Sequence, residues 1–340
     1  MDPAHTRRVT LIVPCWNAGP HLRPLLDSLL AQTEREPVIV LVDDRSDDGS
    51  AEFARVHGGS RIEVLVNEQR LGIAGNWNRC AELVATPYFT LAHMDDVYEP
   101  GYAVALADAL DGDPRAGAAH CIATAIDAAG ATLDAPQERY KLRAWRGLEG
   151  ADRAEVYRRL LRANFVAAPS VMWRRTAFRA IGGFDPRLRF ALDWDAALRL
   201  LLAGHGLRGV PRALVRYRRH AASATAGLGA GGERYREEAA VGAQAHAAGI
   251  AAGLLARTAR RSRAAIDHLL VDVLLDLESG ARDAARARLR FAREELPGAA
   301  KDPALTLVAA AVRCGRPGRF ALRAAFDAFL ALRAPRRHSM

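Results

Sequence analysis

Short apolar runs alternate with helix-like segments along roughly the first hundred residues of the chain. Continuous apolar runs are typical of strands that are buried on both faces. Four of them predict strands: VTLIVP (9–14), VIVLV (38–42), IEVLV (62–66) and YFTLAH (88–93). Helices are predicted between them: 21–32, 50–56 and 77–85. Such alternation implies right-handed crossovers and a largely parallel sheet, which is an α/β fold.

A cluster of polar residues follows each predicted strand. The clusters are CWN after the first strand, DDRSDDGS after the second, NEQR after the third and MDD after the fourth. Ligands of open parallel sheets bind outside the carboxyl ends of the strands. We therefore expect one pocket to collect all four clusters.

The pattern after residue 101 is less regular. Helices are predicted at 102–110, 151–163 and 192–204. Strands are predicted at 118–130, where a turn is included, and at 170–175 and 211–220. Asp193 is expected to cap the N-terminus of the helix at 192–204, and Gly204 to end it. The Gly-rich stretch 226–233 is the best candidate for a domain boundary.

Only helices are predicted beyond this boundary. Apolar residues from Ile266 to Leu277 follow helical spacing, and Gly280 provides a stop. A polar helix is predicted at 281–295. Residues 313–337 hold a last amphipathic helix with arginines around its apolar positions.

The charge and the cysteine content of the chain limit the kinds of partner and metal site that we expect. The formal net charge is +9, and residues 231–340 hold 19 Lys and Arg against 12 Asp and Glu. A basic segment attracts nucleic acid, anionic lipid or acidic substrates, although an Arg-rich helical surface explains it equally. The four cysteines are scattered without CxxC spacing, which argues against a structural zinc site and a disulfide framework. No secretory signal or membrane-spanning run is recognised, so we expect a cytoplasmic protein.

Two pairs of adjacent carboxylates carry the candidate chemistry. Asp43 and Asp44 follow the second strand, and Asp95 and Asp96 follow the fourth. Hard cations such as Mg²⁺ or Mn²⁺ are held by one or two carboxylates together with substrate phosphates. Each pair alone is explained by turn formation or helix capping, but two pairs at two strand ends of one sheet favour a site. The motifs GxxxxGK[ST], HExxH and GxSxG are absent.

An ordered set of segments resembles a known family. VTLIVPCWNAGPHLRPLLDSLLAQT, VIVLVDDRSDDGS, NEQRLGIAGNWNRCAELVATPYFTLAHMDDVYEPGY, APSVMWRRTAFRAIGGFD and LDWDAALRLLLAGH together are similar to family 2 glycosyltransferases of the GT-A fold over residues 9–225. The resemblance implies a Rossmann-like, mostly parallel sheet with flanking helices at 1–225, with a nucleotide-binding half at about 9–100 and an acceptor half at about 101–225. A helical region would occupy 226–340.

The resemblance also implies an activity and its site residues. The expected reaction is an inverting hexosyl transfer from a nucleotide-sugar, UDP- or dTDP-linked, to an acceptor hydroxyl, in bacterial cell-surface polysaccharide or glycolipid synthesis. The positions that match the donor-binding loops are Pro14, Asn17, Asp43, Asp44, Arg70, Asn76, Asn78 and Asp95. Asp96 and His220 match positions near a Mg²⁺ or Mn²⁺ ion. Asp193 matches the catalytic base.

The sequence departs from the family pattern at one position, and it leaves the identity of the catalytic base and the function open to alternatives. Leu192 stands where the family commonly has Glu, and either Asp193 or Asp195 is the base, since positions i and i+2 do not share a helix face. An inactive sugar-nucleotide-binding or scaffold protein is the alternative function. No nucleic-acid-binding motif is present. The acceptor is expected to be a glycan or lipid-linked, and the C-terminal helices suit peripheral contact with the anionic inner face of the cytoplasmic membrane.

Overall fold

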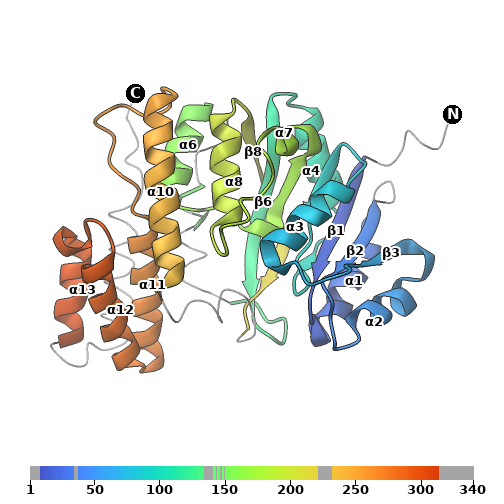
Figure 1. Ribbon diagram of the computed structural model, residues 1–340, viewed down its shortest axis with the longest axis horizontal. Coiled ribbons are helices and arrows are strands. Elements are labelled where there is room, and N and C mark those ends of the chain that lie inside the picture. The colour runs from blue at the N-terminus through green and yellow to red at the C-terminus, as the bar shows by residue number, and fades with distance from the viewer. Residues whose placement is uncertain are drawn as a thin grey trace. The chain divides into compact units, whose positions relative to one another are not determined.

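The computed structural model describes residues 8–33, 37–133, 141–142, 144–145, 148, 150–220 and 232–313 (Figure 1). The chain divides into two compact units. The first unit comprises residues 1–134, 148–157 and 166–221, and the second comprises 135–147, 158–165 and 222–340. The predicted boundary between residues 225 and 226 lies outside the described residues.

An eight-stranded sheet in the order β3-β2-β1-β4-β7-β6-β8-β5 forms the frame of the first unit. Its strands are β1 (Val9–Cys15), β2 (Val38–Asp43), β3 (Ile62–Val66), β4 (Tyr88–Leu91), β5 (Val97–Tyr98), β6 (Ala116–Ile126), β7 (Val171–Arg174) and β8 (Gly206–Arg218). β3, β2, β1 and β4 are parallel neighbours, and β8 is parallel to β6. β7 and β5 run antiparallel to their neighbours. The predicted α/β fold with a mostly parallel sheet is confirmed.

Helices cover both faces of this sheet (Figure 1). They are α1 (Leu22–Leu30), α2 (Ser50–Gly58), α3 (Gly72–Leu83), α4 (Tyr102–Asp111), α7 (Arg175–Ala180) and α8 (Leu192–Leu202). Helix α6 (Arg153–Arg162) is divided between the two units. The helices α1 and α4 share one continuous apolar core with β1, β2 and β6. α3 packs on β1 and β4, whereas α7 and α8 pack on β6, β7 and β8. Every residue of β1 is buried, which is why its sequence reads as an unbroken apolar run.

The strand register brings the loops after the parallel strands together. Cys15 at the end of β1 pairs with Asp43 at the end of β2, and Asp43 pairs with Val66 at the end of β3. β4 joins the other side of β1, with Leu91 opposite Ile12. The polar clusters that follow these strands therefore lie along one edge of the sheet, as the sequence predicts.

Two element starts lie five residues before their predicted positions, and contacts distant in sequence account for the shifts. Helix α3 begins at Gly72 rather than at residue 77, because the Asp44 carboxylate accepts hydrogen bonds from the amides of Leu71 and Gly72. Strand β8 begins at Gly206 rather than at residue 211. The ladder with β6 shifts register around Pro211, where a bulge removes the need for an amide donor.

The predicted capping role of Asp193 is wrong. The N-cap of α8 is Ala191, and Asp193 lies within the first turn of the helix. Its carboxylate therefore belongs to a helical residue near the positive end of the helix dipole. The suggestion that an aspartate of the 95–96 pair caps the following helix is wrong as well, because α4 has Gly101 at its N-cap and no side-chain cap.

The second unit is helical, as predicted. Its main helices are α10 (Glu233–Ala251), α11 (Ala264–Ser279), α12 (Arg282–Glu295) and α13 (Pro303–Arg313). One apolar core joins them, with Leu269 and Val273 fully buried. Gly280 ends α11 in a left-handed conformation, as the sequence predicts. Beyond Arg313, the predicted last amphipathic helix lies outside the described residues.

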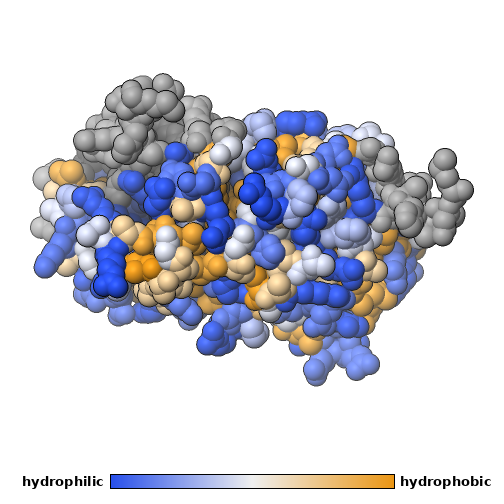
Figure 2. Space-filling view, turned by 90° about the horizontal axis from the view of Figure 1, so that it is seen from above, coloured by the Kyte–Doolittle hydropathy of each residue, from blue (hydrophilic) through white to orange (hydrophobic). Residues whose placement is uncertain are grey.

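The surface seen in Figure 2 is covered mainly by hydrophilic residues, with hydrophobic residues gathered in smaller patches between them. Among the helices within the described ranges, none has the length and apolar character that crossing a membrane requires.

Candidate functional site

The loops after β1 and β2 are locked together by side chain–backbone hydrogen bonds. The Asn17 side chain donates to Asp47 at 2.8 Å and accepts from the Asp47 amide at 3.0 Å. The amide of Gly19 donates to the Asp48 carboxylate at 3.0 Å. Asn17 has a φ of 50°, a left-handed conformation that Asn tolerates better than most residues. The predicted donor-loop residue Asn17 is thus held in a fixed, unusual conformation.

The predicted donor-binding pair, Asp43 and Asp44, lies buried at the end of β2. The Asp43 carboxylate accepts hydrogen bonds from the amide and hydroxyl of Ser46. The Asp44 carboxylate accepts from the Asn67 side chain at 2.9 Å, from Leu71 N–H at 2.7 Å and from Gly72 N–H at 2.8 Å. Asp44 therefore fixes the loop after β3 and the start of α3, and it has one unused lone-pair direction at most.

Two asparagines on α3 are held by contacts within the protein. Asn76 donates to the carbonyl of Val42 at 3.2 Å and accepts from Asn67 at 3.0 Å. The Asn78 side chain donates to the carbonyl of Phe184 at 2.9 Å and accepts from the Phe184 amide at 2.9 Å. The two asparagines thus join α3 to β2 and to the Gly-Gly turn that precedes α8.

Arg70 and Trp16 form the exposed rim of this edge. The Arg70 guanidinium lies 3.7 Å from the centroid of the Trp16 ring, and Trp16 is 41% exposed. Stacking of a guanidinium on an indole is a favourable cation–π contact. Pro14 lies within β1, opposite Val42. Both predicted donor-binding positions, Pro14 and Arg70, therefore lie on the β1–β2–β3 side of the edge.

The second carboxylate pair, Asp95 and Asp96, follows β4 and faces the end of β8. The backbone amide of Arg218 donates to Asp96 at 2.8 Å. The Arg218 guanidinium donates to the carbonyl of Asp95 at 2.9 Å. Nε2 of His220 lies 2.9 Å from the Asp95 carboxylate. The structure thus brings together Asp95, Asp96 and His220, which the sequence places in one metal-binding neighbourhood.

Asp96 is buried in a way that disfavours its charge. Burial, and next the charge of Asp95, raise the pKa of Asp96 well above its ordinary value of 3.8. The amide and charge of Arg218 oppose this rise without reversing it. A cation placed beside the two carboxylates would lower the pKa again and favour both ionised forms. The pair is therefore incompletely compensated by the protein alone.

Histidines surround the carboxylate pair. His93 lies under the Trp77 ring, at 5.0 Å between centroids, and its Nδ1 is 4.0 Å from the Asp96 carboxylate. Its buried Nε2 has no hydrogen-bond partner, and burial lowers the pKa of the ring. The His21 ring, from the start of the first helical segment, lies 4.8 Å from the ring of His220. Burial, and next the charge of Arg218, lower the pKa of His21.

The donor set fits a hard divalent cation that shares its ligands with a substrate. Two carboxylates and an imidazole are ligands that Mn²⁺ and Mg²⁺ accept. Within the part of the chain that the structure describes, no group of three or more His, Cys, Asp or Glu side chains is arranged so that it could hold a metal ion by itself. An ion at Asp95 and Asp96 would therefore need further ligands, such as phosphate oxygens and water.

The acceptor half supplies two carboxylates from the first turn of α8. Asp195 pairs with Arg199 at 2.7 Å, and the same guanidinium donates to the carbonyls of Ile181 and Gly183. Burial raises the pKa of Asp195 although Arg199 opposes the rise. Asp193 is half-buried and lies two positions nearer the start of the helix. The structure thus gives Asp195 an ion-pair partner in Arg199 and places both carboxylates in the first turn of α8.

Sequence reasoning missed several residues that shape the site. Arg218, His93 and His21 contact the Asp95–Asp96 neighbourhood, and Asp47 and Asp48 hold the first loop. The signals were visible in the sequence, since His93 precedes the MDD cluster and Arg218 lies two residues before His220. The sequence around each of these residues does not indicate which distant residue it contacts.

Removing the Asn78 side chain is expected to destabilise the first unit. Asn78→Ala leaves the amide and carbonyl of Phe184 without their side-chain partner, which costs about 2–3 kcal/mol of unfolding free energy. Urea unfolding of the variant and the wild type measures the difference. Arg79→Ala, which changes an exposed neighbour on the same helix, should stay within about 0.5 kcal/mol. Equal stability of Asn78→Ala and wild type would contradict the assigned contact.

Comparison with known proteins places residues 10–181, just over half of the chain, in the sequence family described as glycosyl transferase family 2. The uncharacterized protein MT1568 of Mycobacterium tuberculosis is 30% identical over 202 residues, covering 57% of this chain and 62% of the relative. The processive diacylglycerol beta-glycosyltransferase of Mycoplasma genitalium is 32% identical over 94 residues, covering 26% of this chain and 28% of the relative. The matches thus span less than two thirds of these relatives' own lengths.

Solved structures show the same fold at low identity. The mannosyltransferase PcManGT from Pyrobaculum calidifontis, in complex with GDP-Man and Mn²⁺, aligns with a TM-score of 0.55 and 20% identity, over 99% of this chain and 90% of that chain. Residues 1–349 of S. aureus TarS, in complex with UDP-GlcNAc, align with a TM-score of 0.56 and 12% identity, over 95% and 91%. The likeness confirms the predicted GT-A-type fold.

Proposed function

The chain belongs to glycosyl transferase family 2, and from this membership and the geometry of its sheet edge we propose that it transfers a hexose from a nucleotide-sugar to an acceptor hydroxyl with inversion. The observation that carries the proposal is the placement of two aspartate pairs at the ends of β2 and β4, on the two sides of β1 at one edge of the sheet, with three of the four aspartates buried and the second pair facing His220 and Arg218. Buried charges that lack full compensation are costly, so their retention at a ligand-binding edge points to a charged ligand.

The first aspartate pair and its loops would hold the nucleoside. Asp44 fixes the turn that leads into α3, and the Asn17–Asp47 contacts fix the turn after β1. Prearranged loops of this kind bind a ligand without a further cost of ordering them. Asp43 and Asn76 hold the ends of these loops, Asn78 joins α3 to Phe184, and Arg70 and Trp16 offer a cationic and an aromatic surface at the rim.

The second aspartate pair would hold a divalent cation together with the diphosphate. When bound, Mn²⁺ or Mg²⁺ neutralises the negative charge that gathers on the departing nucleoside diphosphate. Asp96 is assigned as a direct ligand, and Asp95 as a contact to the ribose or to a water of the ion. His220 is oriented by Asp95 and Arg218 lies beside both acids, so these two residues would add positive charge near the phosphates.

Asp193 is assigned as the general base. A sugar hydroxyl is a weak nucleophile, and a carboxylate that accepts its proton during attack on the anomeric carbon accelerates the reaction. Inversion requires the base and the leaving group on opposite sides of that carbon. The arrival of Asp193 from α8, a segment separate from the strand ends that carry the other acids, supports this arrangement.

The donor and acceptor are proposed by class. A UDP- or dTDP-linked sugar is the expected donor, and a GDP-linked sugar is included because one structural neighbour binds GDP-Man. A glycan or lipid-linked acceptor in bacterial cell-surface synthesis is supported by the name of one relative, a processive diacylglycerol glycosyltransferase. We assign the transfer reaction to residues 1–225 and treat residues 226–340 as a separate region.

A screen of nucleotide-sugars in the presence of Mn²⁺ tests the proposal. We expect one base class to raise the melting temperature, the same donor to release nucleoside diphosphate in the presence of an acceptor, and excess EDTA to remove both effects until Mn²⁺ or Mg²⁺ is restored. Full transfer in excess chelator would contradict the role of the ion. Stabilisation without any transfer or donor hydrolysis would favour the inactive sugar-nucleotide-binding protein.

A further inference from the structure

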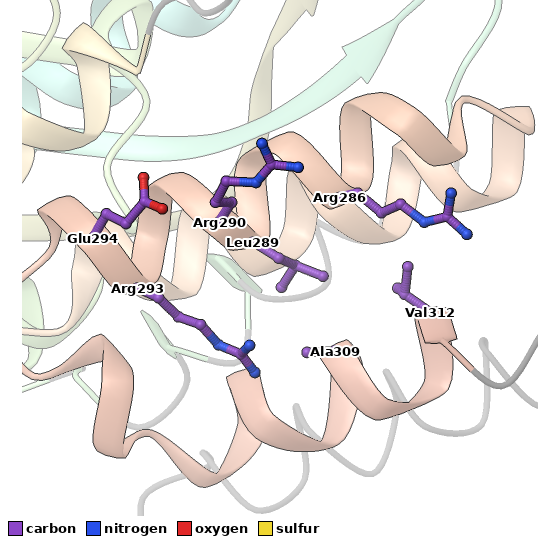
Figure 3. Close-up of a pocket in the computed structure, with 7 residues that line it drawn as sticks. All are labelled: Arg286, Leu289, Arg290, Arg293, Glu294, Ala309 and Val312. Atoms are coloured by element: carbon purple, nitrogen blue, oxygen red, sulfur yellow. The ribbon is translucent and has the colours of Figure 1, made fainter.

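A basic pocket lies between α12 and α13 in the second unit, and none of its lining residues is assigned to catalysis. Its volume is about 350 Å³. Figure 3 shows Leu289 and Arg293 reaching from α12 toward α13, where Ala309 and Val312 face them. The remaining lining residues are Arg286, Arg290 and Glu294. We call this feature the α12–α13 pocket.

Helical spacing gives the α12–α13 pocket its two-part character. Arg286, Arg290 and Arg293 are separated by four and three residues, so they emerge from one side of α12. Leu289, Ala309 and Val312 are buried and form an apolar floor between the two helices. Long arginine side chains beside an apolar floor suit a ligand with an anionic head and an apolar body.

Two of the three pocket arginines form no ion pair with the described residues, and the third forms only an exposed one. Arg286 has one exposed ion pair, with Asp283 at 3.4 Å. Arg290 and Arg293 have no acidic partner among the residues that the structure describes, and Glu294 is the single acid of the lining. Other arginines of the same unit differ, since Arg288 is paired with Asp276 at 2.7 Å. The three pocket arginines are therefore available to an external anion.

We propose that the α12–α13 pocket binds the phosphate headgroup of an anionic membrane lipid, with the glycerol and upper acyl part of that lipid against the apolar floor. Charge complementarity selects the phosphate, and arginine is well suited to it because its planar donor fork binds phosphate oxygens in pairs. The apolar floor favours a lipid over a free phosphate compound, because only the lipid has apolar groups that can pack against it. The proposal concerns helices other than the predicted one at 313–337 and does not depend on the transfer reaction.

Binding of the full chain to lipid vesicles tests this inference. The vesicles contain phosphatidylcholine alone or an equimolar mixture with phosphatidylglycerol, and bound protein is measured by co-sedimentation at physiological ionic strength. We expect binding to the mixed vesicles only. The double substitution R286E/R293E should weaken it at least about tenfold, because each arginine near an anionic surface contributes substantially to binding. Ala309→Trp, which fills the pocket without changing charge, should weaken it to a similar degree.

A matched charge reversal separates the pocket from general electrostatic attraction. Arg257 and Arg260 are exposed in the same unit and do not line the pocket, so R257E/R260E changes the net charge equally. We expect it to weaken binding less than about threefold. Equal losses in the two double variants would overturn the proposal.

A soluble ligand is the second outcome that would overturn it. Binding of glycerol phosphate or inorganic phosphate, lost in R286E/R293E and unaccompanied by vesicle binding, would assign the pocket to a soluble phosphate compound. Circular dichroism verifies that each variant is folded. If Ala309→Trp fails to fold, the test relies on R286E/R293E, which changes two exposed residues. Donor hydrolysis should be unchanged in R286E/R293E, so failure here is distinguishable from failure of the proposed transfer activity.

Discussion

Asp193→Asn is expected to lower the turnover of sugar transfer by at least about 10²- to 10⁴-fold, while the affinity for the donor stays within about threefold of wild type. The carboxamide keeps the size and most contacts of the carboxylate but cannot accept a proton from the acceptor hydroxyl. The measurements are initial rates of nucleoside diphosphate release in the presence of acceptor, and calorimetric titration with the donor. Turnover at the wild-type rate would remove Asp193 from the mechanism.

Asp195→Asn is the matched comparison, because Asp195 lies in the same helical turn and carries the same charge. Its carboxylate pairs with Arg199, which holds the carbonyls of Ile181 and Gly183. We expect this variant to lose about 1–2 kcal/mol of unfolding free energy and to retain activity within about tenfold at a temperature where it is folded. The opposite pattern, with activity lost only in Asp195→Asn, would make Asp195 the base.

Asp96→Asn is expected to have the second large effect, a loss of transfer of about 10²-fold or more together with weaker donor binding. The substitution removes a negative charge that burial already disfavours, so the folded protein should not become less stable. A loss of activity without a loss of stability is expected of a carboxylate that binds a ligand rather than stabilising the fold. Stability by urea unfolding and donor affinity with and without Mn²⁺ measure the two effects.

Asp108→Asn is the control for this change. Asp108 is exposed and pairs with Arg8, and it lies on α4 rather than at the strand ends. We expect activity and metal dependence of Asp108→Asn to match the wild type. Loss of activity in Asp108→Asn to the same extent as in Asp96→Asn would attribute the effect to net charge rather than to the site.

The sheet and the edge that carries the site could be predicted because their signals are local. Strands buried on both faces read as unbroken apolar runs, and β1 and β3 occur within one residue of their predicted bounds. Parallel strands must then present their following loops at one edge. The grouping of Asp43 and Asp44 with Asp95 and Asp96 follows from this rule alone.

The partners of these side chains could not be predicted because they are distant in sequence. The amide of Arg218 reaches Asp96 across 122 positions, and Asn78 reaches Phe184 across 106. Hydrophobic periodicity carries no information about such pairs. The start of α3 was misplaced for the same reason, since the Gly-rich sequence at 72–75 disfavours a helix and only the distant Asp44 carboxylate stabilises its first turn.

Mn²⁺ binding, followed by the electron paramagnetic resonance signal of the free ion, tests the central claim that the strand-end carboxylates hold a cation together with a diphosphate. The titration is performed with and without UDP, dTDP or GDP, on the wild type and on Asp96→Asn. We predict that one of these nucleotides tightens Mn²⁺ binding to the wild type at least about tenfold, by linkage, and that Asp96→Asn abolishes this coupling. Mn²⁺ affinity that is unaffected by every nucleotide, or coupling that survives in Asp96→Asn, would contradict the account.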